Sequence, residues 1–381
     1  MHNTVIGIII GLVIGVVFGA TIVGPRLSET LTKETIYRSN QESSQNMKSK
    51  VPQKEPITDN TVTRWKIASM FPSRVSPLGR LSKRLETLIW RTSSGQLEVI
   101  MEAPETLISA ANVLNSVSSG KIVGAFGTPA SWSSKIPALK LFSNVPFGPN
   151  IQEFLTWLGH GGGGKIYQNF MKKMGIHGIF CGVIAAEGGG WFRAPVKTIE
   201  GLKTLKVATE GFGASILKRI GAKTVLLSPG DIFVAFETGK IDAAEFSTPQ
   251  IDATLGLHDA AKYYYFPGWQ QSSTVFDLII NEKVWKTLSP SLKTSIETVC
   301  GDNIRFGVAN SEGNQYAALK SLTHKGVKTL RLPREIIKAM KLSWSEVVKD
   351  ESNKNAEFAL TWKSLANFRK DYSIWRELSR Y

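Results

Sequence analysis

Residues 188–252 decide the fold, and they read GGGWFRAPVKTIEGLKTLKVATEGFGASILKRIGAKTVLLSPGDIFVAFETGKIDAAEFSTPQID. Three short apolar runs within this stretch, 205–209, 224–228 and 241–246, have the composition of strands. Two segments with helix-like spacing separate them. Strands that alternate with helices form βαβ units and a parallel sheet. The stretch therefore predicts an α/β fold.

Boundary signals mark both of the predicted helices. The first helix is expected to end at Gly221, and Gly239 follows the second. Glycine is common just past a helix because it adopts the left-handed conformation at little cost. Ser228 is the predicted N-cap of the second helix, Pro229 its first helical residue, and Asp231 stands in the capping-box position.

The carboxyl ends of the predicted strands carry Ala208, Thr209, Glu245 and Phe246. Open parallel sheets bind ligands outside these ends. A charged residue that leaves a buried strand is costly unless a partner satisfies it. Glu245 is therefore the first residue to which we assign a function.

The same order of elements is predicted closer to the N-terminus. Strands are expected at 65–70, 97–101 and 121–126, and helices at 78–90 and 111–117. A β-α-β-α-β pattern thus occurs twice, before Gly127 and after Lys206. Two similar α/β lobes are predicted, and a cleft between lobes is a common ligand site.

The C-terminal third has mainly helical patterns. We expect helices at 284–308, 314–325, 335–350 and 358–378, and a strand at 327–332. The helical pattern is expected to be broken near Gly301-Asp302-Asn303. Basic and acidic residues alternate along the last two helices, as on solvated helix faces.

The charge balance of the chain is strongly basic. Its 381 residues include 46 Lys and Arg against 31 Asp and Glu, a net charge of +15. Such a balance suits an anionic ligand, an acidic partner or an anionic membrane face. The basic residues are scattered, without a nucleic-acid-binding motif, so a nucleic-acid partner is not expected.

Residues 5–23 are uncharged and long enough to span a bilayer. Residues 1–24 are either a cleaved signal segment or a retained membrane anchor. No basic residue precedes the stretch and no A-x-A-like site follows it, which favours the anchor. Arg26 follows it, which conflicts with the positive-inside rule unless the segment is cleaved. Residues 25–63 are polar without apolar periodicity and predict a disordered tether.

No catalytic motif stands out. Residues 159–165 match G-x-x-x-x-G-K by letter, but Ile166 stands where a phosphate loop needs Ser or Thr. A glycine-rich turn between two helices is expected there instead. His160 and His177 have no nearby Cys or acidic partner in the sequence. An enzyme is therefore not predicted.

The chain has two cysteines, Cys181 and Cys300. They form neither a C-x-x-C motif nor a metal-binding spacing. Pairing in an oxidising compartment is one alternative, but sequence alone does not bring the two thiols together. Two buried free thiols are the expectation.

The chain resembles the periplasmic solute receptors of TRAP (tripartite ATP-independent periplasmic) transporters, and within them the receptors of keto acids and related small organic acids. The resemblance extends from Trp65 to about Arg376. The segments that carry it are WKIASMFP, VPFGPN, WLGHGGG, GGGWFRAPVKTIEGLKTLKVA, GDIFVAFETGKIDAAEFSTP, YYYFPGWQQ and LIINEKVWKTL. Many such segments in the same order make a specific signal.

The resemblance implies a two-lobed, periplasmic-binding-protein-like clamshell with crossing segments and long bracing helices at the C-terminus. One lobe would comprise residues 64–186 plus 275–314, and the other 187–274 plus 315–381. The receptor would close over one small organic acid and deliver it to a TRAP membrane permease. No chemistry on the ligand is implied.

The resemblance also implies the roles of several residues. The family's carboxylate-binding arginine corresponds to Ala208 here, so the usual guanidinium is missing. A second family arginine corresponds to Arg193, for which a surface ion pair is the alternative to ligand contact. Trp132, Trp191 and Trp269 are candidate walls of the ligand site, although an aromatic residue is more often plain core.

A metal cation beside the ligand is implied as well. Its ligands would be Glu187, Glu245, the carbonyl oxygen of Phe246 and Gln271. Two carboxylates with neutral oxygens suit a hard cation such as sodium or calcium. The alternative is that both carboxylates pair with Arg or Lys across the cleft. Phe246 is also a candidate wall.

We therefore expect a periplasmic receptor whose pocket is wide, weakly cationic and occupied by a metal ion beside the ligand. The receptor would be anchored to the inner membrane if residues 5–23 are retained. Glycines at 7, 11, 15 and 19 fall on one face of that segment, so a homodimer is one expected assembly. The alternative function is a membrane-tethered sensor or scaffold that no longer transports. An enzyme on a two-lobed scaffold ranks last.

Overall fold

The computed structural model describes residues 62–73 and 78–379, which belong to one compact unit. The predicted membrane span or signal, residues 5–23, lies outside the described residues. The predicted tether also lies outside them, apart from its last two residues. Among the described residues, no helix is long and apolar enough to cross a bilayer.

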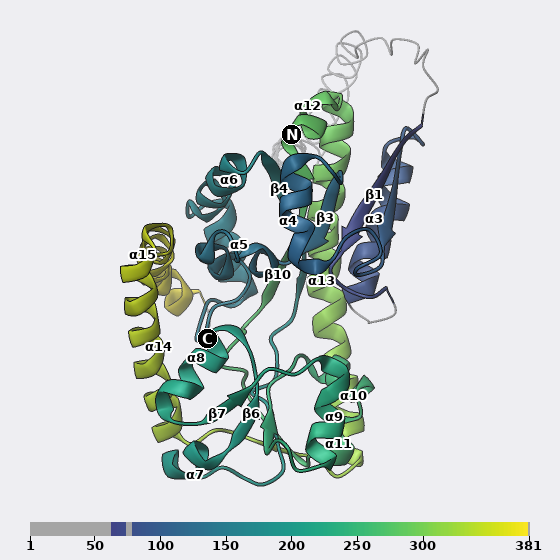
Figure 1. Cartoon of the computed structure of the whole chain (residues 1–381). Helices are drawn as coiled ribbons and strands as arrows, with labels where there is room; N and C mark the ends of the chain where they lie inside the picture. Colours follow the sequence, from purple (N-terminus) through teal and green to yellow (C-terminus); the bar gives the residue numbers. More distant parts are fainter. Residues whose placement is uncertain (1–61, 74–77, 380–381) are drawn as a thin grey trace, which may run out of the picture. The chain divides into compact units, whose positions relative to one another are not determined.

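The first sheet has the strand order β2-β1-β3-β10-β4. β1, β2 and β3 are parallel, whereas β10 pairs antiparallel with both β3 and β4. β10 is buried along its whole length because helices cover both faces of the sheet (Figure 1). The strand bounds are β1 Thr63–Ser69, β2 Leu97–Glu102, β3 Gly124–Gly127, β4 Ile176–Ile184 and β10 Thr274–Asn281.

Helices predicted near the first sheet are confirmed. The long predicted helix before β2 is α3, Leu78–Thr92, and the next is α4, Val113–Ser119, after a short 3₁₀ turn η2, Ala110–Asn112. The glycine-rich segment is the expected turn between α5, Ile151–Gly159, and α6, Gly163–Lys173. Gly162 adopts the left-handed conformation there, with φ of 88°. Two further 3₁₀ turns are η3, Pro129–Trp132, and η4, Pro137–Phe142.

The predicted break near residues 301–303 is wrong. α12, Glu282–Thr287, is followed by one continuous helix, α13, Pro290–His324. Asn303 is fully buried in it and donates from its side chain to the carbonyl oxygens of Leu81 and Cys181. A Cβ atom at Gly301 would have no neighbour within 4 Å. Tertiary hydrogen bonds therefore outweigh the weak helix propensity of this segment.

The expectation of two free thiols is also wrong. Cys181 on β4 and Cys300 on α13 form a disulfide bond across 119 residues of sequence. Both residues are fully buried in the apolar cluster between the first sheet and α13. Disulfides persist in oxidising compartments.

The second sheet has the strand order β11-β9-β5-β8-β6-β7. β7, β6 and β8 are parallel, as residues 188–252 predicted, whereas β5 runs antiparallel to β8 and β9. Its strands are shorter than predicted. Their bounds are β5 Trp191–Phe192, β6 Lys206–Ala208, β7 Lys223–Val225, β8 Ala243–Ala244, β9 Tyr263–Tyr265 and β11 Lys328–Leu330.

The C-terminal ends predicted for the two helices of this sheet region are confirmed. α8, Gly211–Ile220, ends at Gly221, and Gly239 follows α9, Pro229–Glu237; both glycines have positive φ. The predicted capping box of α9 is not formed. Ser228 is the N-cap, but its hydroxyl donates to Asp231 Oδ2 at 2.6 Å instead of accepting a backbone N–H. The remaining helices of this part are α7 Ile199–Thr204, α10 Pro249–Thr254 and α11 Leu257–Ala260.

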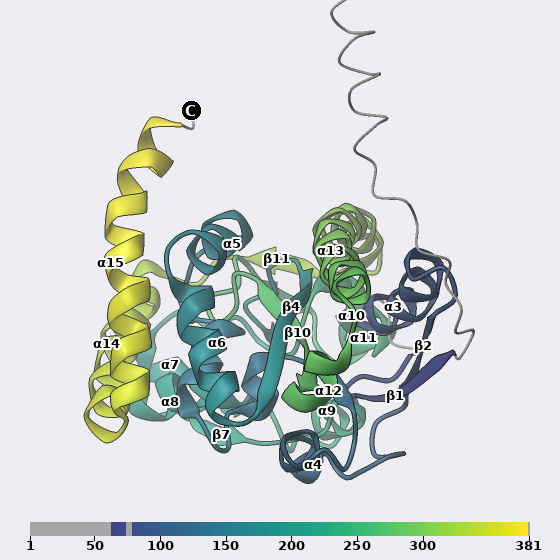
Figure 2. The same cartoon turned by 90° about the horizontal axis from the view of Figure 1, so that it is seen from above.

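Long C-terminal helices contact both parts of the fold. α14, Arg334–Lys354, packs against α8, and α15, Ala356–Leu378, packs against α5 and η4 (Figures 1 and 2). Arg369 on α15 pairs with the buried carboxylate of Glu153 at 3.0 Å and donates to the carbonyl oxygen of Phe147. The α/β, two-lobed fold class with long C-terminal helices is confirmed, whereas the lobe boundaries remain a prediction.

The chain crosses between the sheets through two loops, the crossing segments, and once more through α13. One loop connects β4 to β5 and carries Glu187; the other connects β9 to β10 and carries Trp269 and Gln271. The backbone N–H of Glu187 donates to the carbonyl oxygen of Gln271 at 3.2 Å. The two segments therefore lie side by side where the lobes meet.

Candidate functional site

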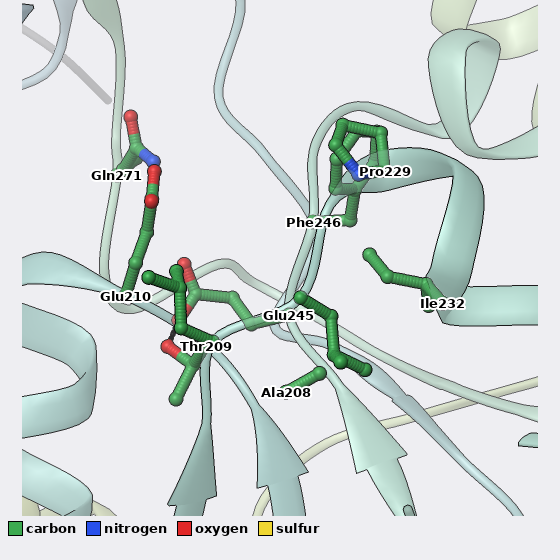
Figure 3. A pocket seen from close by; sticks show the side chains of 10 residues that line it. Ala208, Thr209, Glu210, Pro229, Ile232, Glu245, Phe246 and Gln271 are labelled. Carbon is green, nitrogen blue, oxygen red and sulfur yellow. Dashed lines mark hydrogen bonds between the residues drawn. The ribbon is translucent and has the colours of Figure 1, made fainter. Parts of the chain in front are cut away.

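A pocket of about 130 Å³ lies at the carboxyl ends of β6 and β8 (Figure 3). This is the edge at which an open parallel sheet binds its ligands. The acidic side chains of Glu210 and Glu245 line it together with the amide of Gln271. Its other lining residues are mainly apolar: Ala208, Thr209, Leu226, Leu227, Pro229, Ile232 and Phe246.

Glu245 is held at the end of β8. Its backbone N–H donates to the carbonyl oxygen of Ala208 at 2.9 Å, and the hydroxyl of Thr209 donates to its Oε2 at 2.6 Å. A Cβ atom at Gly213 would lie only 2.6 Å from the same oxygen, so this approach requires glycine. Burial raises the pKa of Glu245 to about 7, although the Thr209 hydrogen bond opposes the shift.

Glu187 reaches the same place from the first crossing segment. The next residue, Gly188, donates its N–H to the carbonyl oxygen of Ser247, which directly follows Phe246. Together with the bond from Glu187 N–H to Gln271, this contact brings the segments of all four predicted metal ligands to one place. Glu187 itself is only 5% exposed.

The surroundings of Glu187 disfavour the ionised form of its own carboxyl group. Burial raises its pKa well above the ordinary value, and the charges of Glu245, Asp252 and Glu210 raise it further. Its Oε2 atom has no hydrogen-bond partner. A buried oxygen without a partner, beside other carboxylates, is satisfied either by a proton or by a cation.

The donor set fits a hard cation. Two carboxylates, one amide oxygen and one backbone carbonyl oxygen are the ligands that sodium and calcium prefer. Within residues 62–73 and 78–379, no group of three or more His, Cys, Asp or Glu side chains could hold a metal ion. A site here would therefore depend on neutral oxygens as well as on Glu187 and Glu245. Gln271 Oε1 is oriented by the hydroxyl of Thr274 at 2.7 Å.

A second pocket, of about 380 Å³, adjoins the first and is lined from both lobes. Glu210, Leu226, Glu245 and Gln271 line both pockets. The first lobe contributes residues of η3, η4 and the loop after η4, and the second lobe contributes the first turn of α8. These residues are Ala130, Ser133, Lys140, Asn144 and Pro146, and Gly211, Phe212 and Gly213.

Two of the predicted aromatic walls are core residues instead. Trp132 is fully buried and donates its Nε1–H to Asp277 at 2.9 Å. Trp191 is also fully buried, stacks on Tyr264 and donates to Asp252 at 2.8 Å. Each indole N–H is satisfied by a buried carboxylate, and neither residue lines either pocket.

Trp269 and Phe246 lie closer to the site. Phe246 lines the first pocket. Trp269 lines a small cavity beside Glu245, and its carbonyl oxygen accepts the N–H of Phe147 at 2.7 Å. Both residues remain candidate walls.

Arg193 does not reach the site. It is exposed, its N–H donates to the carbonyl oxygen of Asp242 before β8, and its side chain lies beside Gly239 at the end of α9. β5 runs antiparallel to β8, so its downstream end reaches the opposite edge of the sheet. The expectation of ligand contact by Arg193 is therefore corrected.

Two residues near the site were not predicted from the sequence. Asp252 is a buried carboxylate on α10 whose pKa burial raises to about 7, and its charge acts on Glu187. Asp252 lies in the mostly polar segment STPQIDAT, which carried no signal of burial. Lys140 lines the second pocket but belongs to no motif, so only the fold could have revealed it.

Comparisons with known proteins agree with this geometry. The sequence profile of the bacterial extracellular solute-binding proteins of family 7 matches residues 68–355. A monocarboxylate 2-oxoacid-binding periplasmic protein from Nostoc is 27% identical over 319 residues, which cover 83% of this chain and 86% of the relative.

Solved structures of similar proteins match as well. A TRAP transporter solute-binding protein from Bordetella bronchiseptica, a dimer with calcium and picolinate bound, superposes with a TM-score of 0.78 at 27% identity, covering 84% of this chain and 95% of that one. A TRAP periplasmic solute-binding protein from Pseudoalteromonas atlantica, with sodium and pyruvate bound, gives a TM-score of 0.77 at 25% identity, covering 84% and 97%.

Proposed function

Because the chain belongs to family 7 of the bacterial extracellular solute-binding proteins, we propose that it binds a small organic acid together with a cation and delivers the acid to a TRAP membrane permease. The family and its structural relatives are receptors, so the prediction of a receptor and not an enzyme is confirmed. Family membership also favours transport over the alternative of a tethered sensor that no longer transports.

The observation that carries this proposal is the buried, unpartnered Oε2 of Glu187 among other carboxylates. In our proposal Glu187, Glu245, the carbonyl oxygen of Phe246 and Gln271 hold the cation. Similar proteins contain calcium or sodium with picolinate or pyruvate, which supports the same class of ion and acid here. The cation would supply the positive charge that attracts the acid.

The residues of the chain have separate parts in this scheme. Thr209 orients Glu245 by its hydrogen bond, and Thr274 orients Gln271. Ala208 and Trp269 are proposed walls of the ligand site. Because Ala208 carries no charge, binding would depend on the cation more than on a guanidinium at that position.

Calorimetric titration of pyruvate tests the proposal. Binding is expected with calcium and should weaken sharply after the calcium is removed by a chelator. The role of sodium is tested by replacing sodium salts in the buffer with choline salts. Glu187→Gln should weaken cation-dependent binding by more than about tenfold, whereas the exposed Glu377→Gln should not. Equal affinity for a panel of organic acids with and without cations would contradict the cation's role.

Location and assembly are proposed on further grounds. The buried Cys181–Cys300 disulfide suits an oxidising, extracytoplasmic location. We also propose that residues 5–23 anchor the protein to the inner membrane. Cell fractionation tests this by measuring whether the protein stays in the membrane fraction after an alkaline wash. Release of the full-length protein by the wash would contradict anchoring.

A homodimer is proposed through α15. Ile374, Trp375 and Leu378 are large apolar side chains exposed on this helix, and the relative from Bordetella bronchiseptica is a dimer. Light scattering is expected to give twice the monomer mass, and Trp375→Ser should shift the mass towards the monomer. A monomer at micromolar concentration would refute it.

A further inference from the structure

The outer face of α15 carries a row of exposed residues whose spacing is symmetric about Asn367. Exposed side chains stand 4, 7 and 11 positions before Asn367 and 4, 7 and 11 positions after it. These intervals keep all of them on one face of a helix. The members of this α15 row are Ala356, Leu360, Lys363, Asn367, Asp371, Ile374 and Leu378.

The chemistry of the α15 row is complementary about the same centre. Lys363 and Asp371 are equidistant from Asn367 and carry opposite charges, whereas Leu360 and Ile374 are equidistant from it and both apolar. The ion pairs that α15 forms within the described part of the chain use other residues, namely Glu357, Arg369 and Arg376. An antiparallel copy of the helix would therefore place each lysine against an aspartate. A parallel copy would place like charges together, which disfavours it.

A groove of about 440 Å³ lies beside one end of the row, between α6 and α15 (Figure 2). Ile166, Phe170 and Leu360 give it an apolar lining, and Lys172 and Lys173 line it as well. Leu360 is 56% exposed there. An apolar groove with ammonium groups beside it suits an aromatic ring, which gains from burial and from cation–π attraction.

The other end of the row offers such a ring. Trp375 directly follows Ile374 and is 61% exposed. In an antiparallel pair of α15 helices, Ile374 of a second copy lies opposite Leu360. Trp375 of that copy therefore arrives beside the groove.

We propose that two copies of the chain pair through antiparallel α15 helices, with the two-fold axis at Asn367 and with Trp375 of each copy in the groove between α6 and α15 of the other. The inference rests on the homodimer included in the proposed function, and deepens it by placing the axis and naming the groove. A two-fold axis makes every contact twice, so two ion pairs form between Lys363 and Asp371. Asn367 meets its own copy on the axis, where a polar side chain fixes the register of a helix pair.

Cross-linking of the whole chain in mild detergent tests the position of the axis. The two native cysteines are joined in a disulfide, so Asn367→Cys introduces a single free thiol. On the axis this thiol lies within disulfide reach of its own copy, and mild oxidation should give a covalent dimer. Lys363→Cys is the matched control, because it lies on the same face but about 12 Å along the helix from its own copy. It should cross-link only when mixed with Asp371→Cys. Equally efficient cross-linking of Lys363→Cys alone would overturn the inference.

Charge reversal tests the antiparallel direction. Asp371→Lys should raise the dissociation constant of the dimer about tenfold, because both copies of an exposed pair become repulsive. Adding Lys363→Asp to the same chain should restore the affinity. Light scattering over a concentration series measures the constant. If the double reversal weakens the dimer more than Asp371→Lys alone, the two residues do not face each other and the antiparallel pairing falls.

Two substitutions test the groove. Leu360→Gln and Trp375→Ser should each raise the dissociation constant at least about tenfold, and the double variant should lose little more, because both remove one contact. Leu342→Gln is the control, since Leu342 is 61% exposed on α14 outside the row. A dimer that Asn367→Cys does not cross-link and Leu360→Gln does not weaken would overturn this inference but leave homodimerisation standing through another surface. A wild-type protein that stays monomeric would remove both.

Discussion

Replacing Asp277 by Asn should remove one contribution to the pH dependence of the protein's stability. Asp277 is fully buried on β10 and accepts hydrogen bonds from Trp132 Nε1 at 2.9 Å and from the Tyr167 hydroxyl at 2.5 Å. Burial raises its pKa from 3.8 to about 7, although both hydrogen bonds act against the shift. The folded protein therefore binds this proton more tightly than the unfolded chain does.

The sign and size follow from proton linkage. The stabilisation by the bound proton is complete below the unfolded pKa of 3.8 and is lost as the pH rises to about 7. A shift of roughly three pKa units corresponds to about 4 kcal/mol of unfolding free energy. Asn resembles the protonated carboxyl group, so Asp277→Asn should be less sensitive to pH across this window.

Urea unfolding at half-unit steps between pH 4 and 8 measures the effect. Calcium should be removed with a chelator, so that cation binding does not contribute. Glu187, Glu245 and Asp252 also have raised pKa values, but they are present in both proteins and cancel in the difference. The stability of Asp277→Asn relative to the wild type should rise by a few kcal/mol as the pH increases. A difference that stays constant, as expected for the exposed control Asp371→Asn, would refute the reasoning.

Three further predictions concern stability and the site. Replacing Cys181 and Cys300 by Ala should lower the unfolding free energy by about 2–5 kcal/mol; chemical unfolding checks this, and an unchanged midpoint would contradict it. Among the described residues, Arg369→Ala leaves the buried carboxylate of Glu153 with only one ion pair, the weaker one to Arg376 at 3.6 Å. Thermal unfolding should therefore reveal a loss of about 3 kcal/mol, and a loss below 1 kcal/mol would count against a structural ion pair. Gly213→Ala should weaken calcium binding in calorimetry because the new Cβ would displace the carboxylate oxygen of Glu245. The helix itself should keep its stability. Normal calcium affinity would argue against that oxygen as a ligand.

Much of the fold could be predicted because local signals and packing agree. The alternation of strands and helices in residues 188–252 gave the parallel core of the second sheet. The glycines at 221 and 239 marked helix ends because both positions have positive φ. The continuity of α13 could not be predicted, since it depends on hydrogen bonds from Asn303 to two distant carbonyl groups.

Part of the candidate site could be predicted because the order of strands and helices is visible in the sequence. The place of Glu245 beside the first pocket followed from its position after a strand, whereas its role as a cation ligand with Glu187, Phe246 and Gln271 stays a prediction. Arg193 was misplaced because the antiparallel direction of β5 could not be read from two strand residues. Trp132 and Trp191 were misassigned because sequence does not show that a buried carboxylate satisfies each indole. The disulfide and Lys140 depend on contacts between distant segments.

Anomalous diffraction from crystals grown with calcium and an organic acid tests the central claim most directly. The account predicts one calcium peak about 2.3–2.6 Å from oxygens of Glu187, Glu245 and Gln271 and from the carbonyl oxygen of Phe246. A structure that contains the acid but no calcium peak there, with the two carboxylates paired to Lys or Arg, would contradict it.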